Sequence, residues 1–344
     1  MQPTIAGVVD DERYDERYMA RALAVASTVR TTTSPNPWVG AVLVTSTAEF
    51  EAATAPPGGP HAEVAAIRLA CDAGAATAGA TLYTTLEPCA HHGRTPPCAG
   101  AIVEAGISRV VVGLVDPDPQ VAGRGVALLE AAGVEVRVGV AAAAAEAQLA
   151  PYLKHRRTGR PWVVLKLATT LDGRIAAPDG SSRWITGEAA RRDVHRLRAA
   201  SDAVLVGAGT VRADDPELTV RSVPASRQPL RVVLGKAPAG AKVHPALELG
   251  GDLGEVLDRL GQLGVVQLLV EGGARVARDL HAAGLVDRYV LYLAPALFGG
   301  DDARPAFSGR GAPTIDDLWH GRVVAVDRLG EDLRVELAPG GEAR

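Results

Sequence analysis

The sequence predicts an α/β protein built from two different domains, and three observations carry this prediction. Helical patterns alternate with short runs rich in β-branched residues along the whole chain. The chain has 344 residues, and a domain usually takes about 150 residues. No repeat relates the first half to the second, so two unrelated domains are expected rather than a duplication.

The first half alternates between helices and strands. The expected elements are a helix over 15–29, the strand "VGAVLV", a helix over 62–73, the strand "ATLYTTL", a helix near 97–105, and the strands "RVVVGLV" and "GVEVRVGV". An alanine-rich helix and a basic turn with Gly159 and Pro161 then interrupt the pattern. We therefore expect the two domains to span 1–147 and 148–344.

The second half keeps the α/β style with different contents. Its expected strands are "WVVLKLA", "DAVLVGAGTV", "LRVVLG", "VQLLVEGG", "RYVLYLAP", "RVVAVDRLG" and "DLRVELAP". Several of these runs end at glycine, which is typical of a strand that turns into a helix.

Composition limits the partners. A net charge of −4 provides no broad cationic field for a nucleic-acid backbone, and aromatic residues make up only 4% of the chain. No run of about 18 apolar residues is present to span a bilayer, and the acidic N-terminus is unlike a signal peptide. These features favour a cytoplasmic protein that binds a small molecule, with no nucleic acid and no membrane.

Three residues have the chemistry of a zinc site. Zinc takes three or four nitrogen and sulfur ligands, and a catalytic site keeps one position for water. His61, Cys89 and Cys98 form such an open set, and Glu63 follows the histidine closely enough to face the metal-bound water without ligating. H-x-E followed by P-C and a second cysteine is the zinc deaminase signature, in which the glutamate shuttles a proton.

The cysteine spacing departs from that signature. Eight residues separate Cys89 from Cys98, where two are usual. Cys89 follows a strand and Cys98 stands where a helix begins, so helix amides would favour its thiolate. Cys71 lies within a helix and is expected in the core. A closed, structural zinc site with His91 or His92 as the fourth ligand is the alternative from another class, a non-catalytic binding protein.

The long insertion between the cysteines carries His91, His92 and Arg94. These groups bring positive charge and hydrogen-bond donors beside the metal, where a phosphorylated or carbonyl-bearing substrate needs them.

The motifs "SPNPWVGAVLV", "HAEVAAIRLA", "TLEPCAHHGRTPPC" and "DPDPQVAGRG" closely resemble the N-terminal half of the bifunctional deaminase/reductase family of riboflavin biosynthesis. The resemblance implies a three-layer fold similar to cytidine deaminases and a diaminopyrimidinone ribosylamino 5′-phosphate as substrate. It implies Zn²⁺ on His61, Cys89 and Cys98, with Glu63 as the proton shuttle. It further implies substrate contacts, which are assigned to Asn36, His91 and Arg94.

The segment 45–60 departs from the family. Members usually form a short hairpin there, with an Asp-Gly turn and a second strand, whereas this chain has "TSTAEFEAATAPPGGP". We therefore expect the wall of the deaminase pocket to differ.

Two glycine turns of the second half, in "VLVGAGTVRADDP" and "LLVEGGARVARDL", suit phosphate binding at a helix start. Neither is a G-x-G-x-x-G fingerprint, so no classical Rossmann domain is expected. With "LKLATTLDGRIAAPDGSSRWITGEAARRDVHRLRA" and "LYLAPALFGG", these turns resemble the reductase half of the same family. That half has a dihydrofolate-reductase-like fold and uses NADPH.

The resemblance assigns residues to the reductase site. Five of them contact NADPH: Ala168, Trp184, Thr210, Asp214 and Gly273. Six hold the ribosylamino phosphate or lie near its sugar: Lys166, Ser182, Arg198, Leu218, Arg221 and Glu271. An opened ribose needs a polar group to guide its proton, and Glu271 and Asp214 are both candidates.

A second departure affects segment 236–254. It is shorter than in the family, so a strand at the cofactor edge is expected to be missing. Arg275 replaces a small or hydroxylated residue, and it either binds the extra phosphate of NADPH or crowds it.

The main hypothesis is a two-step enzyme, a zinc-dependent deaminase domain followed by an NADPH-dependent reductase domain. The alternative within the enzymes is a deaminase of a related metabolite whose reductase half has lost its cofactor. A homo-oligomer is expected from the family alone.

Overall fold

The computed structural model describes residues 5–91 and 96–340. Arg94 and His92 lie outside the described residues. The chain divides into two compact units, Met1–Thr158 and Gly159–Arg344. The expected boundary after residue 147 is too early, because it falls inside the helix α5 (Ala142–Thr158). This helix packs against the first unit, and its Tyr152 hydroxyl donates to the carboxylate of Asp116 at 3.0 Å.

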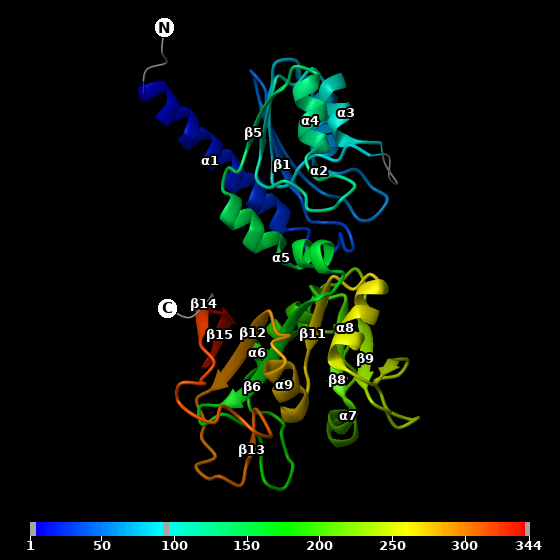
Figure 1. Ribbon diagram of the computed structural model, residues 1–344, viewed down its shortest axis with the longest axis vertical. Helices are drawn as coiled ribbons and strands as arrows, with labels where there is room; N and C mark the ends of the chain where they lie inside the picture. Colours follow the sequence, from blue (N-terminus) through cyan, green and yellow to red (C-terminus); the bar gives the residue numbers. More distant parts are fainter. Residues whose placement is uncertain (1–4, 92–95, 341–344) are drawn as a thin grey trace. The chain divides into compact units, whose positions relative to one another are not determined.

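A five-stranded mixed sheet forms the centre of the first unit (Figure 1). Its strands are β1 (Gly40–Val44), β2 (Glu49–Ala53), β3 (Thr81–Thr84), β4 (Arg109–Val112) and β5 (Glu135–Val138). The order is β2-β1-β3-β4-β5, with β1 antiparallel to both of its neighbours and β3, β4 and β5 parallel.

Helices cover both faces of this sheet, which gives the three layers that the sequence predicts. α1 (Ile5–Ser27) and α5 lie on one face, while α2 (Ala62–Asp72), α3 (Cys98–Glu104) and α4 (Arg124–Ala131) lie on the other (Figure 1). The aromatic side chains of Tyr18 and Tyr83 stack at 4.9 Å between α1 and the sheet. The parallel edge of the sheet follows from the β-α-β connections through α3 and α4.

The hairpin expected to be absent from segment 45–60 is present. β2 pairs with β1 over five positions, from Gly40 opposite Ala53 to Val44 opposite Glu49. Thr45 replaces the Asp-Gly turn, since its hydroxyl donates to the carbonyl of Ala48 at 2.8 Å and accepts the amide of Ala48 at 3.0 Å. A threonine turn of this kind makes the same reversal without a positive φ.

Cys71 is exposed, contrary to the expectation that it lies in the core. The buried residues of α2 are Ala62, Glu63, Ala66, Ile67 and Ala70. These positions follow a helical period of three to four, and position 71 falls just beyond the edge of this buried stripe.

An eight-stranded sheet forms the centre of the second unit (Figure 1). Its order is β10-β9-β8-β11-β6-β12-β15-β14. The strands are β6 (Trp162–Thr170), β8 (Ala203–Gly207), β9 (Leu230–Leu234), β10 (Leu247–Leu249), β11 (Gln267–Val270), β12 (Arg288–Ala294), β14 (Gly321–Leu329) and β15 (Asp332–Pro339). A separate pair joins β7 (Arg174–Ala176) to β13 (Arg304–Pro305).

Alternate residues of the central strands enter two different cores. Val163, Leu165 and Leu167 of β6 belong to a cluster that includes buried side chains of α8 (Leu253–Gln262) and α9 (Ala274–Ala282). Val164 belongs to the opposite cluster, with side chains of α6 (Glu188–Ala199) and α7 (Ala208–Asp214). A strand buried on both faces needs the continuous apolar run "WVVLKLA".

The strand expected to be missing from segment 236–254 also forms. β10 pairs in parallel with β9, with Leu247 opposite Val232. Glu248 fixes the compressed segment, because its carboxylate accepts the amide of Ala237 and pairs with Lys236, both at 2.9 Å.

None of the helices described is both long and apolar enough to cross a lipid bilayer.

Candidate active sites

The predicted zinc ligands converge in the first unit. The ligand atoms of His61, Cys89 and Cys98 all lie within 4.8 Å of one another. His61 Nδ1 is 3.6 Å from Cys89 Sγ and 3.2 Å from Cys98 Sγ. Ligand atoms on one tetrahedral zinc are separated by about 3.5 Å when the metal bonds are about 2.0 to 2.3 Å long. One imidazole and two thiols at these separations fit Zn²⁺ with one position left open.

Helix N-termini position two of the three ligand residues. His61 is the N-cap of α2, and Cys98 is the first residue of α3. The amide of Cys98 donates to Cys89 Sγ at 3.4 Å. The hydrogen bond from the Cys98 thiol, together with that from His61, lowers the pKa of the Cys89 thiol well below its usual value. One sulfur is thus prepared as a thiolate, the form that binds metal.

Glu63 lies beside this cluster without being part of it. It is in the first turn of α2, and only 3% of it is exposed. Burial raises the pKa of Glu63 to about 7, although the charge of His61 acts in the opposite direction. A carboxyl group with such a pKa exchanges a proton readily near neutral pH.

The structure describes two of the three predicted substrate contacts of this unit. His91 is half-buried, and its Nδ1 is buried with no hydrogen-bond partner among the described residues. Asn36 is half-buried in the turn before β1, and its backbone amide donates to the backbone carbonyl of Thr33 at 2.9 Å. Arg94 falls among the residues that are not described. Within the described chain, the ligand cluster has three members, and His91 is not one of them.

A cavity of about 790 Å³ opens in the second unit and contains the predicted reductase residues. It is lined by Lys166, Ala168, Ser182, Trp184, Arg198, Thr210, Asp214, Leu218, Arg221, Glu271 and Gly273, together with residues of α6 and of the loop after α7. The volume suits a phosphorylated small molecule with part of a cofactor.

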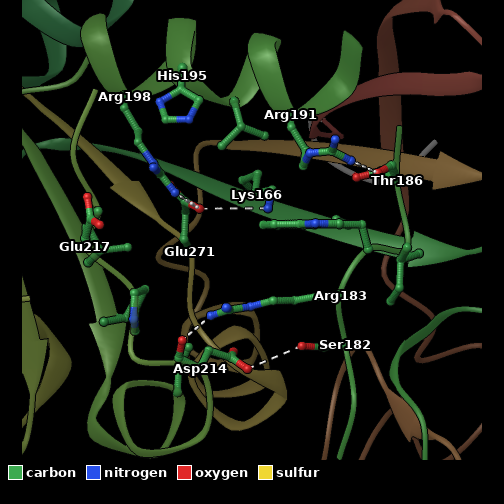
Figure 2. A pocket seen from close by; sticks show the side chains of 18 of the residues that line it. Lys166, Ser182, Arg183, Thr186, Arg191, His195, Arg198, Asp214, Glu217 and Glu271 are labelled. Carbon is green, nitrogen blue, oxygen red and sulfur yellow. Dashed lines mark hydrogen bonds and ion pairs between the residues drawn. The ribbon is translucent and has the colours of Figure 1, made fainter. Parts of the chain in front are cut away.

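A buried ionic centre forms one wall of this cavity (Figure 2). Arg198 donates to both oxygens of Glu271, at 2.6 and 3.0 Å, and the Lys166 ammonium is 3.8 Å from the same carboxylate. Burial lowers the pKa of Lys166. Burial acts to raise the pKa of Glu271, but the charges of Arg198 and Lys166 prevail and hold it below the usual value.

Arg198 is more fully engaged than the resemblance implies. Besides Glu271, it donates to the carbonyl of Thr219 at 3.0 Å, and its side chain is 12% exposed. Arg221 is on the same cavity and half exposed, paired with Glu217 at 2.6 Å. Of these two arginines, Arg221 is therefore the one whose guanidinium is more accessible to a ligand in the cavity.

Asp214 and Trp184 also line the cavity. The Asp214 carboxylate accepts the hydroxyl of Ser182 at 3.3 Å, and its backbone carbonyl accepts from Arg183 (Figure 2). Trp184 is 69% exposed, and the Arg191 guanidinium lies 4.7 Å from its ring centre. An aromatic ring this open at a cavity is available to a planar ligand.

Apart from Arg198, the residues of α6 that line the cavity were not among the predicted site residues. Glu188, Arg191, Arg192 and His195 line it together with Arg198. These positions recur at helical spacing on a helix that also places Ala190 and Val194 in the core. A stripe of charged residues at helical spacing was therefore the sequence feature that could have predicted this face of the cavity.

A second cavity of about 690 Å³ adjoins the first, and Ser182, Thr210, Asp214 and Gly273 line both. The second cavity is bounded by Gly207 and Gly209 near the start of α7 and by Gly273 and Ala274 at the start of α9. Added carbon atoms would crowd the glycine turn: a Cβ on Gly272 would meet Val276 at 2.8 Å, and one on Gly273 would meet Thr210 at 3.0 Å. Such close turns let backbone amides approach a phosphate.

Two family models match the chain. "Cytidine and deoxycytidylate deaminase zinc-binding region" matches residues 12–114, and "RibD C-terminal domain" matches residues 161–335.

Relatives of known name match nearly the whole chain. The riboflavin biosynthesis protein RibD of Escherichia coli is 39% identical, covering 94% of this chain and 99% of the relative. RibD of Mycobacterium tuberculosis is 41% identical, covering 96% of this chain and 98% of the relative. The solved structure of Acinetobacter baumannii RibD superposes with a TM-score of 0.90 at 38% identity, covering 96% of this chain and all of the other. A solved structure from Thermotoga maritima is named as a diaminohydroxyphosphoribosylaminopyrimidine deaminase/5-amino-6-(5-phosphoribosylamino)uracil reductase. It superposes with a TM-score of 0.85 at 35% identity, covering 96% of this chain and all of the other.

A zinc-binding deaminase fold in one unit and a reductase fold with a cofactor-sized cavity in the other define a bifunctional deaminase and reductase. The expected fold class is thereby confirmed. Within that class, the chain belongs to the RibD family of riboflavin biosynthesis enzymes. Its cofactors are Zn²⁺ in the deaminase unit and NADPH in the reductase unit.

Proposed function

We propose that the first unit deaminates 2,5-diamino-6-(5-phosphoribosylamino)pyrimidin-4-one to 5-amino-6-(5-phosphoribosylamino)uracil, and that the second reduces the ribosyl group to ribityl. The observation that carries this proposal is the pair of sites: an open His-Cys-Cys cluster beside a protonatable Glu63, and a cavity with a buried ionic centre. The Thermotoga maritima protein is named for the same two activities.

In deamination, His61, Cys89 and Cys98 would hold Zn²⁺, which when bound would activate a water at neutral pH. Glu63 takes a proton from that water and delivers it to the departing amino group. Its pKa of about 7 suits both directions of transfer. His91, whose Nδ1 has no partner among the described residues, contacts the substrate together with Asn36. Arg94 completes this set as a phosphate ligand.

In reduction, the ribosylamine opens to an imine, with the former ring oxygen becoming a hydroxyl. NADPH, when bound, would supply the hydride for C1′, so the residues of this chain must bring one proton to the nitrogen. Glu271 is a poor donor, because Arg198 and Lys166 hold its pKa low and keep it as a carboxylate. Asp214 is already hydrogen-bonded to Ser182. Lys166 has protons to give and a lowered pKa, so we assign it as the proton donor.

The substrate phosphate binds at the open side of the first cavity. Arg221 is half exposed there, and Arg192 lines the same cavity without an ion-pair partner among the described residues. Arg198 holds Glu271 in place instead of gripping the phosphate. Ser182 and Leu218 border the same ligand.

The cofactor spans both cavities. Ala168, Trp184, Thr210 and Asp214 receive the nicotinamide end, and the Gly273 turn receives the pyrophosphate at the start of α9. Arg275, on the second cavity, is exposed and has no ion-pair partner among the described residues. Arg212 and Arg304 line the same cavity; both are also exposed and have no ion-pair partner among the described residues. Three uncompensated cations around one cavity favour a strongly anionic end of the ligand, such as the 2′-phosphate.

Replacing Arg275 by alanine separates the two roles open to it. If Arg275 binds the 2′-phosphate, R275A loses about 1.5 kcal/mol of NADPH binding, roughly tenfold in Kd, and leaves NADH unchanged. Fluorescence titration with both cofactors measures this. R322A, a change at an exposed arginine of β14, is the control. Tighter NADPH binding by R275A would mean that the side chain crowds the cofactor, and equal weakening of both would exclude selectivity for the 2′-phosphate.

Product masses test the function as a whole. Zinc-loaded protein is incubated with the diaminopyrimidinone substrate, with and without NADPH. We expect deamination in both reactions and a further gain of two hydrogens only with NADPH. Deamination without reduction would favour the alternative with an inactive reductase half. That alternative began from the shortened segment 236–254, in which β10 nevertheless forms.

A homo-oligomer and a cytoplasmic location stay predictions. Val323 and Val326, on the edge strand β14, are 57% and 58% exposed, which supports a contact with a second copy of the chain. Light scattering would contradict this if it gave the mass of a single chain at micromolar concentration.

A further inference from the structure

A buried carboxylate lies two residues before the zinc ligand Cys89. Glu87 is 4% exposed and follows β3 in the segment "TLEPC". None of the ion pairs in the described chain involves it. A charge in such a place needs hydrogen bonds to replace its lost hydration.

Four backbone amides supply those hydrogen bonds. One oxygen of Glu87 accepts the amides of Asp116 at 3.1 Å and Gly123 at 2.9 Å, and the other accepts those of Gly125 at 2.9 Å and Val126 at 3.2 Å. Three of the four amides belong to the N-cap and first turn of α4, which is where a helix favours negative charge. One side chain therefore holds the loop that follows β4, at Asp116, to the start of α4.

The backbone around Glu87 is also fixed by contacts with the same loop and with α4. Its amide donates to the carbonyl of Leu114 at 2.8 Å. The Pro88 carbonyl lies against Gly125, where a Cβ would come within 1.9 Å of the oxygen. The chain therefore leaves Glu87 in a fixed direction, and Cys89 is the next residue after Pro88.

Cys89 depends on this support more than the other ligands do. His61 caps α2 and Cys98 begins α3, so the backbone of each is set by a helix. Cys89 lies in irregular chain. Its local hydrogen bonds are with the start of α3. The backbone amide of Cys98 donates to the Cys89 sulfur at 3.4 Å, and the backbone amide of Ala99 donates to the Cys89 carbonyl at 3.1 Å.

We propose that Glu87 is the positioning residue of the metal centre: it anchors the Glu87–Cys89 turn on the loop between β4 and α4 and thereby sets the Cys89 sulfur for Zn²⁺. It acts through the backbone and does not ligate. The motif "DPDPQVAGRG" then has a local purpose, since residues 116–126 supply the amides that receive this carboxylate.

The test is E87Q in the full-length, zinc-loaded protein. The amide group of glutamine places an NH₂ where one carboxylate oxygen accepts two amides, so two of the four hydrogen bonds become repulsive contacts. We expect Zn²⁺ to dissociate about 10- to 100-fold faster in chelator competition, the range found when outer ligand supports are removed. The Co²⁺-substituted variant should show a weakened sulfur-to-cobalt charge-transfer band. Reduction of predeaminated substrate, in the separate second unit, should be unchanged.

D15N is the matched control. Asp15 is an equally buried carboxylate of the same unit, 1% exposed, and it pairs with Arg109 at 2.7 Å and Arg137 at 2.9 Å without contacting the ligands. D15N should lower Tm while leaving the Zn²⁺ dissociation rate and the Co²⁺ spectrum as in wild type. E87D, which keeps the charge, should recover part of the metal retention and serves if E87Q does not fold.

Equal Zn²⁺ dissociation from E87Q and wild type, with only Tm lowered, would overturn the proposal and leave Glu87 a purely structural group. The inference rests on the zinc centre proposed above. Wild-type protein that retains no zinc after loading would overturn that centre, and this inference with it, before any variant is compared.

Discussion

Replacing Glu63 by glutamine is expected to lower the rate of deamination by about 10²- to 10⁴-fold, the usual contribution of a positioned proton carrier. Glutamine keeps the size and the hydrogen-bonding reach of the side chain, but its amide group does not accept or release a proton near neutral pH. Because Glu63 is outside the ligand cluster, the zinc content should stay at that of wild type. Single-turnover deamination and metal analysis of the same sample measure both quantities.

Two comparisons make this result decisive. E104Q, at an exposed position at the end of α3, should deaminate like wild type. The reductase activity of E63Q should also be intact, because the change lies in the other unit. If deamination survives in E63Q, Glu63 is not the proton carrier. A structural zinc site, the non-catalytic alternative, would have no deamination for the substitution to remove.

The ligand cluster was predictable because its signals are local. A histidine at a helix start, a cysteine after the following strand and a cysteine at the next helix start are three signals that each depend only on nearby residues. His61 and Cys98 occupy those helix starts in the structure. The strands of the second unit were predictable for a related reason, since a strand buried on both faces leaves a continuous apolar run.

The errors came from contacts that sequence periodicity does not record. The β1–β2 reversal relies on the hydroxyl of Thr45, a less familiar turn former than Asp-Gly. α5 belongs to the first unit because Gln148 and Tyr152 bond to Leu23 and Asp116, which are distant in sequence. Glu87 was overlooked for the same reason: its partners lie about 30 to 40 positions further along the chain.

Within the reductase cavity, the sequence identified the residues but not their division of labour. Arg198 and Arg221 were equivalent as phosphate ligands until the structure paired the first with Glu271 and left the second half exposed. Which carboxyl group could give a proton was equally open. That question depends on burial and charge around Glu271, and the charged neighbours concerned come from β6 and α6.

Replacing Lys166 by methionine should therefore abolish most of the reduction, by about 10²- to 10⁴-fold if Lys166 is the proton donor. Methionine fills the same buried space without the ammonium, and Glu271 keeps its bidentate partner Arg198. NADPH binding and deamination should be unchanged. Stopped-flow oxidation of NADPH with predeaminated substrate measures the step directly.

The pH dependence gives an independent check on this role. Burial lowers the pKa of Lys166, so its protonated form is lost at a lower pH than that of an ordinary lysine. A proton donor acts in its protonated form, and the wild-type reduction rate should consequently fall as pH rises through that lowered pKa. K166M should lose this alkaline limb, whereas K242Q, a change at an exposed lysine on the same cavity, should keep both rate and limb. Full reduction by K166M, or an alkaline limb that persists in it, would return the assignment to Asp214 or to water, because Glu271 is held as a carboxylate by Arg198.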